Sequence, residues 1–246
     1  MKTDNGLRPL PVAIIFDLDD TILAYGDPEE CWRTVCGRFV SRVGVSSVDE
    51  LLVAINEARD WYWGDLERHR QGRLVLSDTR RQIVAMAFSH LGIDAPEVAV
   101  ELADTYAEMR EGRAHPFPGA IDTIQHFRSQ GVRLGLVTNG GSEMQRGKLV
   151  RFGLVPYFDF ILIEGEFGAG KPDERVFFHM LEQLGVTATD TWMVGDDLQR
   201  DIAGAQTLGM FTVWVDWRGG GLPDSSTVQP DRIINHLSEL RYHSIS

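Results

Sequence analysis

The stretch AIIFDLDDT, residues 13–21, decides the fold of this chain. Its first four residues are apolar, which is typical of a strand that is covered on both faces of a sheet. Three carboxylates, Asp17, Asp19 and Asp20, follow where such a strand ends. Crowded carboxylates repel one another and lose hydration there, so we expect a divalent cation to compensate for them. The alternative is an acidic loop or helix cap that binds nothing.

The 246 residues have the composition of a globular protein, with 43% hydrophobic and 24% charged side chains. They suffice for one large domain or for a core with a smaller domain. A net charge of −12 argues against nucleic acids and membranes as partners. The chain shows neither a signal peptide nor an apolar run of membrane-spanning length, so we expect a cytoplasmic protein. Cys31 and Cys36 are predicted to be reduced, half-buried thiols.

From Asp27 to about Gly112 the pattern of apolar residues is almost wholly helical. An Asp followed by Pro and two Glu is a typical helix start, and a Ser three residues before a Glu is a capping box. Such signals predict four helices, which begin near Asp27, Ser47, Ser77 and Pro96. Four helices with short connections indicate a small bundle.

Beyond His115 strands and helices alternate. The predicted strands span residues 133–138, 158–163, 191–194, 211–215 and, as a short edge, 232–234. Helices are predicted at 119–130, 142–152, 172–184, 198–208 and 237–240. Repeated strand–helix units imply a parallel sheet, to which residues 12–16 also belong. We therefore predict an α/β fold, in which a doubly wound parallel-sheet, Rossmann-like core (1–25 and 113–246) carries an inserted α-helical bundle as a cap domain (26–112).

Polar residues follow three further segments of the predicted core. Thr138 and Asn139 end a strand before two glycines, where they could bind an oxyanion or simply form a turn. Lys171 precedes a helix, and its charge would be useful beside acids. Asp196 and Asp197 end another buried strand, with Asp201 shortly after them. Because ligands bind at the carboxyl ends of parallel strands, we expect this second acidic cluster to face the first.

This order of motifs, DxDDT, TN, KP and GDDxxxxD, resembles that of the haloacid dehalogenase superfamily. It looks most like the phosphatase branch, whose helical cap is inserted after the first motif. Each motif is weak alone, but together they are quite specific and cover nearly the whole chain. The resemblance implies a Mg²⁺-dependent hydrolase that cleaves the phosphomonoester of a small metabolite through an aspartyl-phosphate.

The resemblance also implies roles for the first motif. Asp17 would be the nucleophile, and Asp19 would protonate the leaving group and then activate water. Thr21 would fix the turn that aims Asp19. The dehalogenase branch lacks an acid at the position of Asp19, so this residue favours a phosphatase over a dehalogenase. A phosphomutase of the same superfamily would share all four motifs and stays open.

The other motif residues would surround the metal and the phosphoryl group. Mg²⁺ would be held by the carboxylates of Asp17 and Asp196 and by the backbone carbonyl of Asp19. Asp197 and Asp201 would orient metal-bound water, although direct contact with the metal stays open. The phosphoryl oxygens would be neutralised by Thr138, the Asn139 backbone and Lys171.

We expect the cap to close over the site and to choose the substrate. Its residues Trp61, Trp63, Arg68, His69, Arg70 and Arg73 could contact a substrate. They could equally be cap core and a solvated helix end. Sugar phosphates, nucleoside monophosphates and phosphorylated acids all stay open as substrates, and the oligomeric state is not predicted.

Three other interpretations fit less well. A phospho-accepting signalling switch of the receiver type would have its acid pair first and its Lys last, whereas Lys171 precedes Asp196 here. A dinucleotide-binding module would need a GxGxxG motif after the first strand, where this chain has acids. A catalytically dead relative would show a gap in the set of acids, and there is none.

Overall fold

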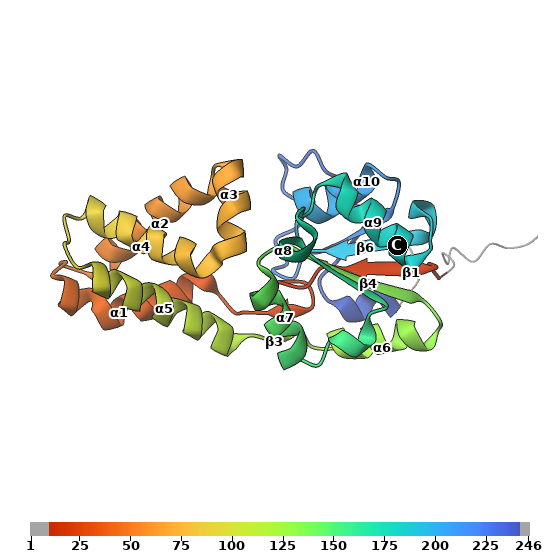
Figure 1. Cartoon of the computed structure of the whole chain (residues 1–246), viewed down its shortest axis with the longest axis horizontal. Coiled ribbons are helices and arrows are strands. Elements are labelled where there is room, and N and C mark those ends of the chain that lie inside the picture. Colours follow the sequence, from red (N-terminus) through yellow and green to blue (C-terminus); the bar gives the residue numbers. More distant parts are fainter. Residues whose placement is uncertain (1–9, 242–246) are drawn as a thin grey trace, which may run out of the picture. The chain divides into compact units, whose positions relative to one another are not determined.

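The computed structural model describes residues 10–241, and the chain divides into two compact units. One, here called the core unit, comprises the residues up to Ala24 and those from His115 onward. The other, the helical unit, comprises Tyr25–Ala114. Figure 1 shows a sheet with helices around it in the first and only helices in the second.

The core unit is built on a six-stranded sheet in the order β5-β4-β1-β6-β7-β8, with every neighbouring pair parallel. The strands are β1 (Ala13–Phe16), β4 (Arg133–Thr138), β5 (Phe160–Ile163), β6 (Thr191–Gly195), β7 (Phe211–Val215) and β8 (Arg232–Ile234). All four side chains of β1 are fully buried at the centre of the sheet. The predicted Rossmann-like α/β fold is therefore confirmed, and so is the edge position of β8.

Helices cover both faces of this sheet (Figure 1). They are α6 (Ala120–Ser129), α7 (Ser142–Arg151), α8 (Glu164–Phe167), α9 (Glu174–Leu184) and α10 (Gly204–Gln206), with 3₁₀ turns at Val155–Tyr157, Ala188–Asp190 and Leu237–Arg241. Helix α9 packs closely on β4, because a Cβ on Gly135 would lie 2.6 Å from the sulfur of Met180. A glycine in mid-strand thus has a packing reason here.

The helix predicted at 198–208 is not one regular α-helix. It begins as a π-helix at Leu198–Ala203 and continues as the short α10. The Asp197 carbonyl accepts hydrogen bonds from the backbone N–H groups of both Asp201 (2.9 Å) and Ile202 (3.3 Å). This sharing widens the turn, and such π-turns are common at functional sites.

The helical unit has its own core and contains five α-helices rather than the predicted four. They are α1 (Pro28–Val43), α2 (Val48–Trp63), α3 (Leu66–Gly72), α4 (Leu76–His90) and α5 (Pro96–Arg113), with a 3₁₀ turn at Arg73–Val75. The prediction missed α3 because this helix is polar and lacks an apolar stripe. The Asp65 carboxylate caps it by accepting a hydrogen bond from Arg68 N at 2.8 Å.

Several local predictions in the helical unit can be compared with its structure. Ser47 caps α2 as expected, and the Glu50 carboxylate accepts a hydrogen bond from Ser46 N. The two cysteines are free, as predicted. They are fully buried rather than half-buried, because Cys31 and Cys36 face the core of the bundle, packed with residues such as Trp32.

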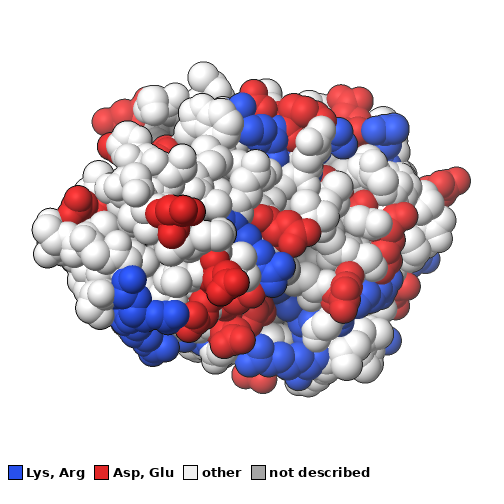
Figure 2. All heavy atoms as spheres, turned by 60° about the vertical axis from the view of Figure 1, so that its left-hand side comes forward, with Lys and Arg blue, Asp and Glu red and all other residues white. Residues whose placement is uncertain are grey.

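Two features complete the fold. A short antiparallel pair, β2 (Leu23–Ala24) with β3 (His115–Pro116), forms where the chain leaves and re-enters the core unit. These two strands were not predicted, because two residues are too few to show the alternation of a strand in the sequence. Within residues 10–241 no helix is long and apolar enough to cross a bilayer. Figure 2 shows acidic and basic side chains interspersed on the face that it presents.

Candidate active site

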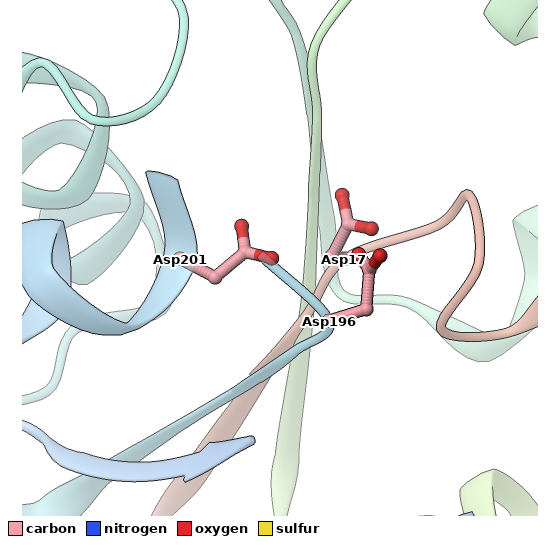
Figure 3. Close-up of side chains that lie close together, drawn as sticks. All are labelled: Asp17, Asp196 and Asp201. Atoms are coloured by element: carbon pink, nitrogen blue, oxygen red, sulfur yellow. The ribbon is translucent and has the colours of Figure 1, made fainter. Parts of the chain in front are cut away.

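Three carboxylates converge at the carboxyl ends of two neighbouring strands. Asp17 follows β1, Asp196 follows β6, and Asp201 lies in the π-helix after them. One oxygen of each carboxylate lies within 4.8 Å of the others (Figure 3). The structure thus brings the first and second acidic clusters together at one edge of the sheet.

The local backbone explains why these groups meet. Phe16 is paired with Val194 in the parallel register, and Asp17 N donates a hydrogen bond to Val194 O at 2.9 Å. Asp17 and Asp196 therefore emerge side by side. A Cβ on Gly195 would overlap the carboxylate of Asp201, so only glycine lets that side chain pass.

Lys171 lies between two of the carboxylates. Its Nζ is 2.5 Å from Oδ1 of Asp17 and 2.6 Å from Oδ1 of Asp201, and these three side chains are 9% exposed or less. The other oxygen of Asp201 accepts a hydrogen bond from Asp197 N at 3.1 Å. Both oxygens of Asp201 are therefore engaged by the protein, which favours Asp17 and Asp196 as direct ligands of any metal.

Burial and mutual repulsion shift the pKa values at this site. Burial raises the pKa of Asp17 to about 7, an effect that Lys171 reduces and Asp201 increases. The pKa of Asp196 lies well above its ordinary value because of burial and of its neighbours Asp17 and Asp201. The pKa of Lys171 is raised because its attraction to Asp17 and Asp201 outweighs its burial. A buried ammonium ion thus serves both carboxylates.

The charges and donors of this cluster fit a divalent metal ion. Three carboxylates against one ammonium group leave a formal surplus of two negative charges, and the available donors are all oxygens. Hard cations such as Mg²⁺ prefer carboxylate oxygens. Such an ion would relieve the repulsion that raises the pKa of Asp196.

Asp19 lies in the loop after β1, where two residues that sequence reasoning missed hold its carboxylate. Lys148 Nζ lies 2.9 Å from both carboxylate oxygens, and Gln145 Nε2 donates to Oδ2 at 2.9 Å. Gln145 and Lys148 stand three residues apart on α7, so they share one face of the helix. Their spacing, in the helix after the Thr138–Asn139 motif, was the sequence signal that could have identified them.

The turn after Asp19 is held by its backbone. Leu18 O accepts hydrogen bonds from the N–H groups of Ile22 and Leu23, each at 2.9 Å, and Asp20 adopts a left-handed φ of 59°. Asp tolerates that conformation better than most residues. The Thr21 hydroxyl is buried without a hydrogen-bond partner among the described residues. Backbone hydrogen bonds therefore hold this turn, and the role of Thr21 stays a prediction.

The Asn139 side chain anchors Lys171. Asn139 Nδ2 donates to Lys171 O and Oδ1 accepts from Lys171 N, both at 2.8 Å. The sequence had suggested that the amide and backbone of this motif bind an oxyanion, and it did not predict this contact with Lys171. The buried Glu164, also missed, accepts a hydrogen bond from Gly140 N at 2.9 Å. Thr138 is buried at the end of β4, beside these groups.

The cap residues that could contact a substrate lie in the helical unit. Trp63 packs against the core of that unit, whereas Trp61 is 55% exposed and lies under the guanidinium of Arg68 at 3.8 Å. Arg70 pairs with Glu67, and the ring of His69 contacts Trp63. Arg73 begins the 3₁₀ turn that precedes α4.

Known proteins resemble this chain over most of its length. The chain is 40% identical to a phosphoserine phosphatase of Thermus thermophilus, over 65% of this chain and 63% of that protein, which is less than two thirds of the relative's length. It is 28% identical to a glyceraldehyde 3-phosphate phosphatase of Methanocaldococcus jannaschii, over 92% of this chain and 94% of that protein.

A solved structure and a family model agree with these relatives. The crystal structure of a HAD phosphatase from Thermococcus onnurineus matches 93% of this chain and 95% of its own, with 29% identity and a TM-score of 0.58. The family model of haloacid dehalogenase-like hydrolases matches residues 12–209, well over half of the chain. The chain therefore belongs to the haloacid dehalogenase-like hydrolase family.

Proposed function

We propose that this protein is a Mg²⁺-dependent phosphomonoester hydrolase that acts on a small phosphorylated metabolite. One observation carries the proposal: Asp17 ends the central strand beside Asp196 and in contact with Lys171, with a second carboxylate, Asp19, two residues further on. A nucleophile, a metal site and an acid–base group thus come from one edge of the sheet. The phosphatase names of the relatives support the same reaction class.

The metal would be held by the carboxylates of Asp17 and Asp196 and by the backbone carbonyl of Asp19. When bound, Mg²⁺ would neutralise charge on the phosphoryl oxygens and on the attacking carboxylate. Asp201 would orient metal-bound water instead of binding the metal directly, because Lys171 and the Asp197 N–H engage its two oxygens. Asp197 itself caps the π-helix by accepting hydrogen bonds from Gln199 N and Arg200 N.

In the first step a carboxylate oxygen of Asp17 attacks phosphorus. The new bond to phosphorus forms as the ester P–O bond breaks, and the leaving oxygen takes a proton from Asp19. Lys171, which lies 2.5 Å from Asp17, fixes the direction of the attacking carboxylate. Thr138 and the Asn139 backbone N–H would bind the phosphoryl oxygens.

In the second step water hydrolyses the aspartyl-phosphate. Asp19, now ionised, takes a proton from the water as the water oxygen bonds to phosphorus, and the bond to Asp17 breaks. Inorganic phosphate leaves and both carboxylates return to their first state. A dehalogenase has no use for an acid at the position of Asp19, because halide leaves without a proton.

We also assign the helical unit the role of a cap that selects the substrate. The predicted core boundaries of 1–25 and 113–246 lie within two residues of those of the core unit. A unit of helices with a core of its own is suited to carry substrate contacts without disturbing the sheet. Trp61 is the most exposed of the aromatic candidates there.

Phosphate release from a panel of small phosphomonoesters tests the proposed function. We expect release with Mg²⁺ and none with excess chelator, and loss of release in Asp17→Asn. Asp190→Asn, directly before the amino end of β6 and so at the opposite edge of the sheet, is the matched control and should keep its activity. Absence of release from every ester by a folded, Mg²⁺-loaded protein would contradict the proposal and favour the dehalogenase, phosphomutase or switch.

A further inference from the structure

The carboxylate of Asp19 is held by two buried side chains whose purpose the roles given above do not explain. Lys148 Nζ contacts both of its oxygens at 2.9 Å, and Gln145 Nε2 reaches Oδ2 at the same distance. Lys148 is 7% exposed and Gln145 is 3% exposed. A lysine is rarely buried to this extent unless it is paired, so this pair has a purpose within the site.

Gln145 connects Asp19 to the nucleophile as well. Its Nε2 also donates to Asn139 O at 2.6 Å, and the Asn139 side chain binds the backbone of Lys171 at 2.8 Å. Lys171 in turn contacts Asp17. A continuous set of hydrogen bonds and ion pairs therefore runs from the acid–base carboxylate to the nucleophile.

Both side chains that hold Asp19 come from α7. The helix is short and strongly polar, yet Gln145, Lys148 and Leu149 are its buried residues. An apolar residue would suffice at Lys148 if packing alone were needed, because burying an ammonium group is unfavourable without a carboxylate partner.

We propose that Lys148 and Gln145 are positioning residues, which fix the Asp19 carboxylate relative to Asp17 for both proton transfers. The inference rests on the proposed function, because it needs Asp19 to act as acid and base. Lys148 and Gln145 act through Asp19 and touch neither substrate nor phosphorus. A misplacement of about 1 Å at a reacting group lowers rates by up to ~100-fold, so we expect losses of about 10- to 100-fold.

Lys148→Met tests the role of Lys148, because it keeps the length of the stem and removes the charge. Arg151→Met, at the exposed end of the same helix, changes the net charge by the same amount and is the control. Circular dichroism and the Mg²⁺ requirement of each variant show that fold and metal site persist.

The kinetic test uses p-nitrophenyl phosphate and a simple alkyl phosphate. Nitrophenolate leaves without a proton, so the first step survives in Lys148→Met while the second step, which needs the base, is slowed. We expect a burst of nitrophenolate followed by a steady state slowed about 10- to 100-fold. The alkyl ester, which needs the acid as well, should show no burst. Arg151→Met should behave like wild type.

A double-mutant cycle then separates positioning from a structural role. In the Asp19→Asn background, Lys148→Met should have almost no further effect, because the group that Lys148 positions is gone. Loss of burst and steady state by one common factor, or an undiminished effect in the Asp19→Asn background, would overturn the inference. Failure of the proposed function would look different, since the wild-type protein would then release no phosphate from any ester, or Asp17→Asn would retain its activity.

Discussion

Replacement of Lys171 by Met removes the cation that two buried carboxylates share. In the native protein its Nζ lies 2.5 Å from Asp17 and 2.6 Å from Asp201, inside a site where all three side chains are almost fully buried. Removing one partner of a buried ion pair leaves an uncompensated charge and typically destabilises a protein by ~3–5 kcal/mol. We expect a loss of about that size in the free energy of unfolding at pH 8 without metal.

The loss should depend on pH and on Asp201. At pH 5 the carboxylates, whose pKa values burial already raises, can take up protons in place of the missing ammonium group, so the loss should be smaller. In Lys171→Met/Asp201→Asn one of the buried charges is gone as well, and at least about half of the lost stability should return. Turnover should stay absent in both variants, because Lys171 also orients the nucleophile.

Urea unfolding followed by tryptophan fluorescence measures these changes, at pH 5 and pH 8 and with excess chelator. Lys171→Arg keeps the charge and serves as the comparison. A loss below about 1 kcal/mol at pH 8 would refute the reasoning, because an exposed pair is worth that little. An equal loss at both pH values would refute it too, since no proton would then replace the cation.

Three further predictions concern the metal, a glycine and the thiols. Without metal, the free energy of unfolding should fall as pH rises from the ordinary carboxylate range toward about 7, because native Asp17 binds protons that the unfolded chain releases. Mg²⁺ should raise the melting temperature more at pH 8 than at pH 5, where protons compete with it. Equal shifts at both pH values would contradict this. Gly170→Ala should destabilise the protein by ~1–3 kcal/mol and reduce turnover at unchanged Mg²⁺ affinity. The new Cβ would lie 2.5 Å from the Glu164 carboxyl carbon and 2.7 Å from Asn139 Oδ1. Wild-type stability in thermal unfolding would show that the loop relaxes freely. Cys31 and Cys36 are both fully buried, and burial also raises the pKa of Cys36 to about 12. A thiol reagent at pH 8 should therefore label neither cysteine until urea is added, and rapid labelling of the native protein would show that the bundle opens.

The sequence predicted the sheet better than the details of its helices. Residues 13–16, 133–138 and 211–215 are mostly apolar stretches, and each became a strand with its end within a residue of the expected place. Helix α3 was missed because it has no apolar stripe, although the Asp65 carboxylate caps its start. The π-helix was missed because one shared carbonyl, Asp197 O, produces it.

The candidate site divides along similar lines. Acids at the ends of β1 and β6 were predictable, because parallel strands end at a common edge. The partners of those acids were not. Lys148 and Gln145 come from a helix face, and Glu164 from a four-residue helix, so only the packing of α7 and α8 against the loops reveals them. Asn139 shows the same limit, since its side chain binds a backbone 32 residues away.

Detection of a phosphoryl group on Asp17 would test the central claim most directly. The protein would be mixed with p-nitrophenyl phosphate and Mg²⁺, quenched in acid, digested and analysed by mass spectrometry, with Asp19→Asn beside it to slow hydrolysis of the intermediate. We predict one phosphoryl group on the peptide that contains Asp17, more of it in Asp19→Asn, none in Asp17→Asn, and its release by hydroxylamine. A phosphoryl group on another residue, or turnover by Asp17→Asn at the wild-type rate, would contradict the account.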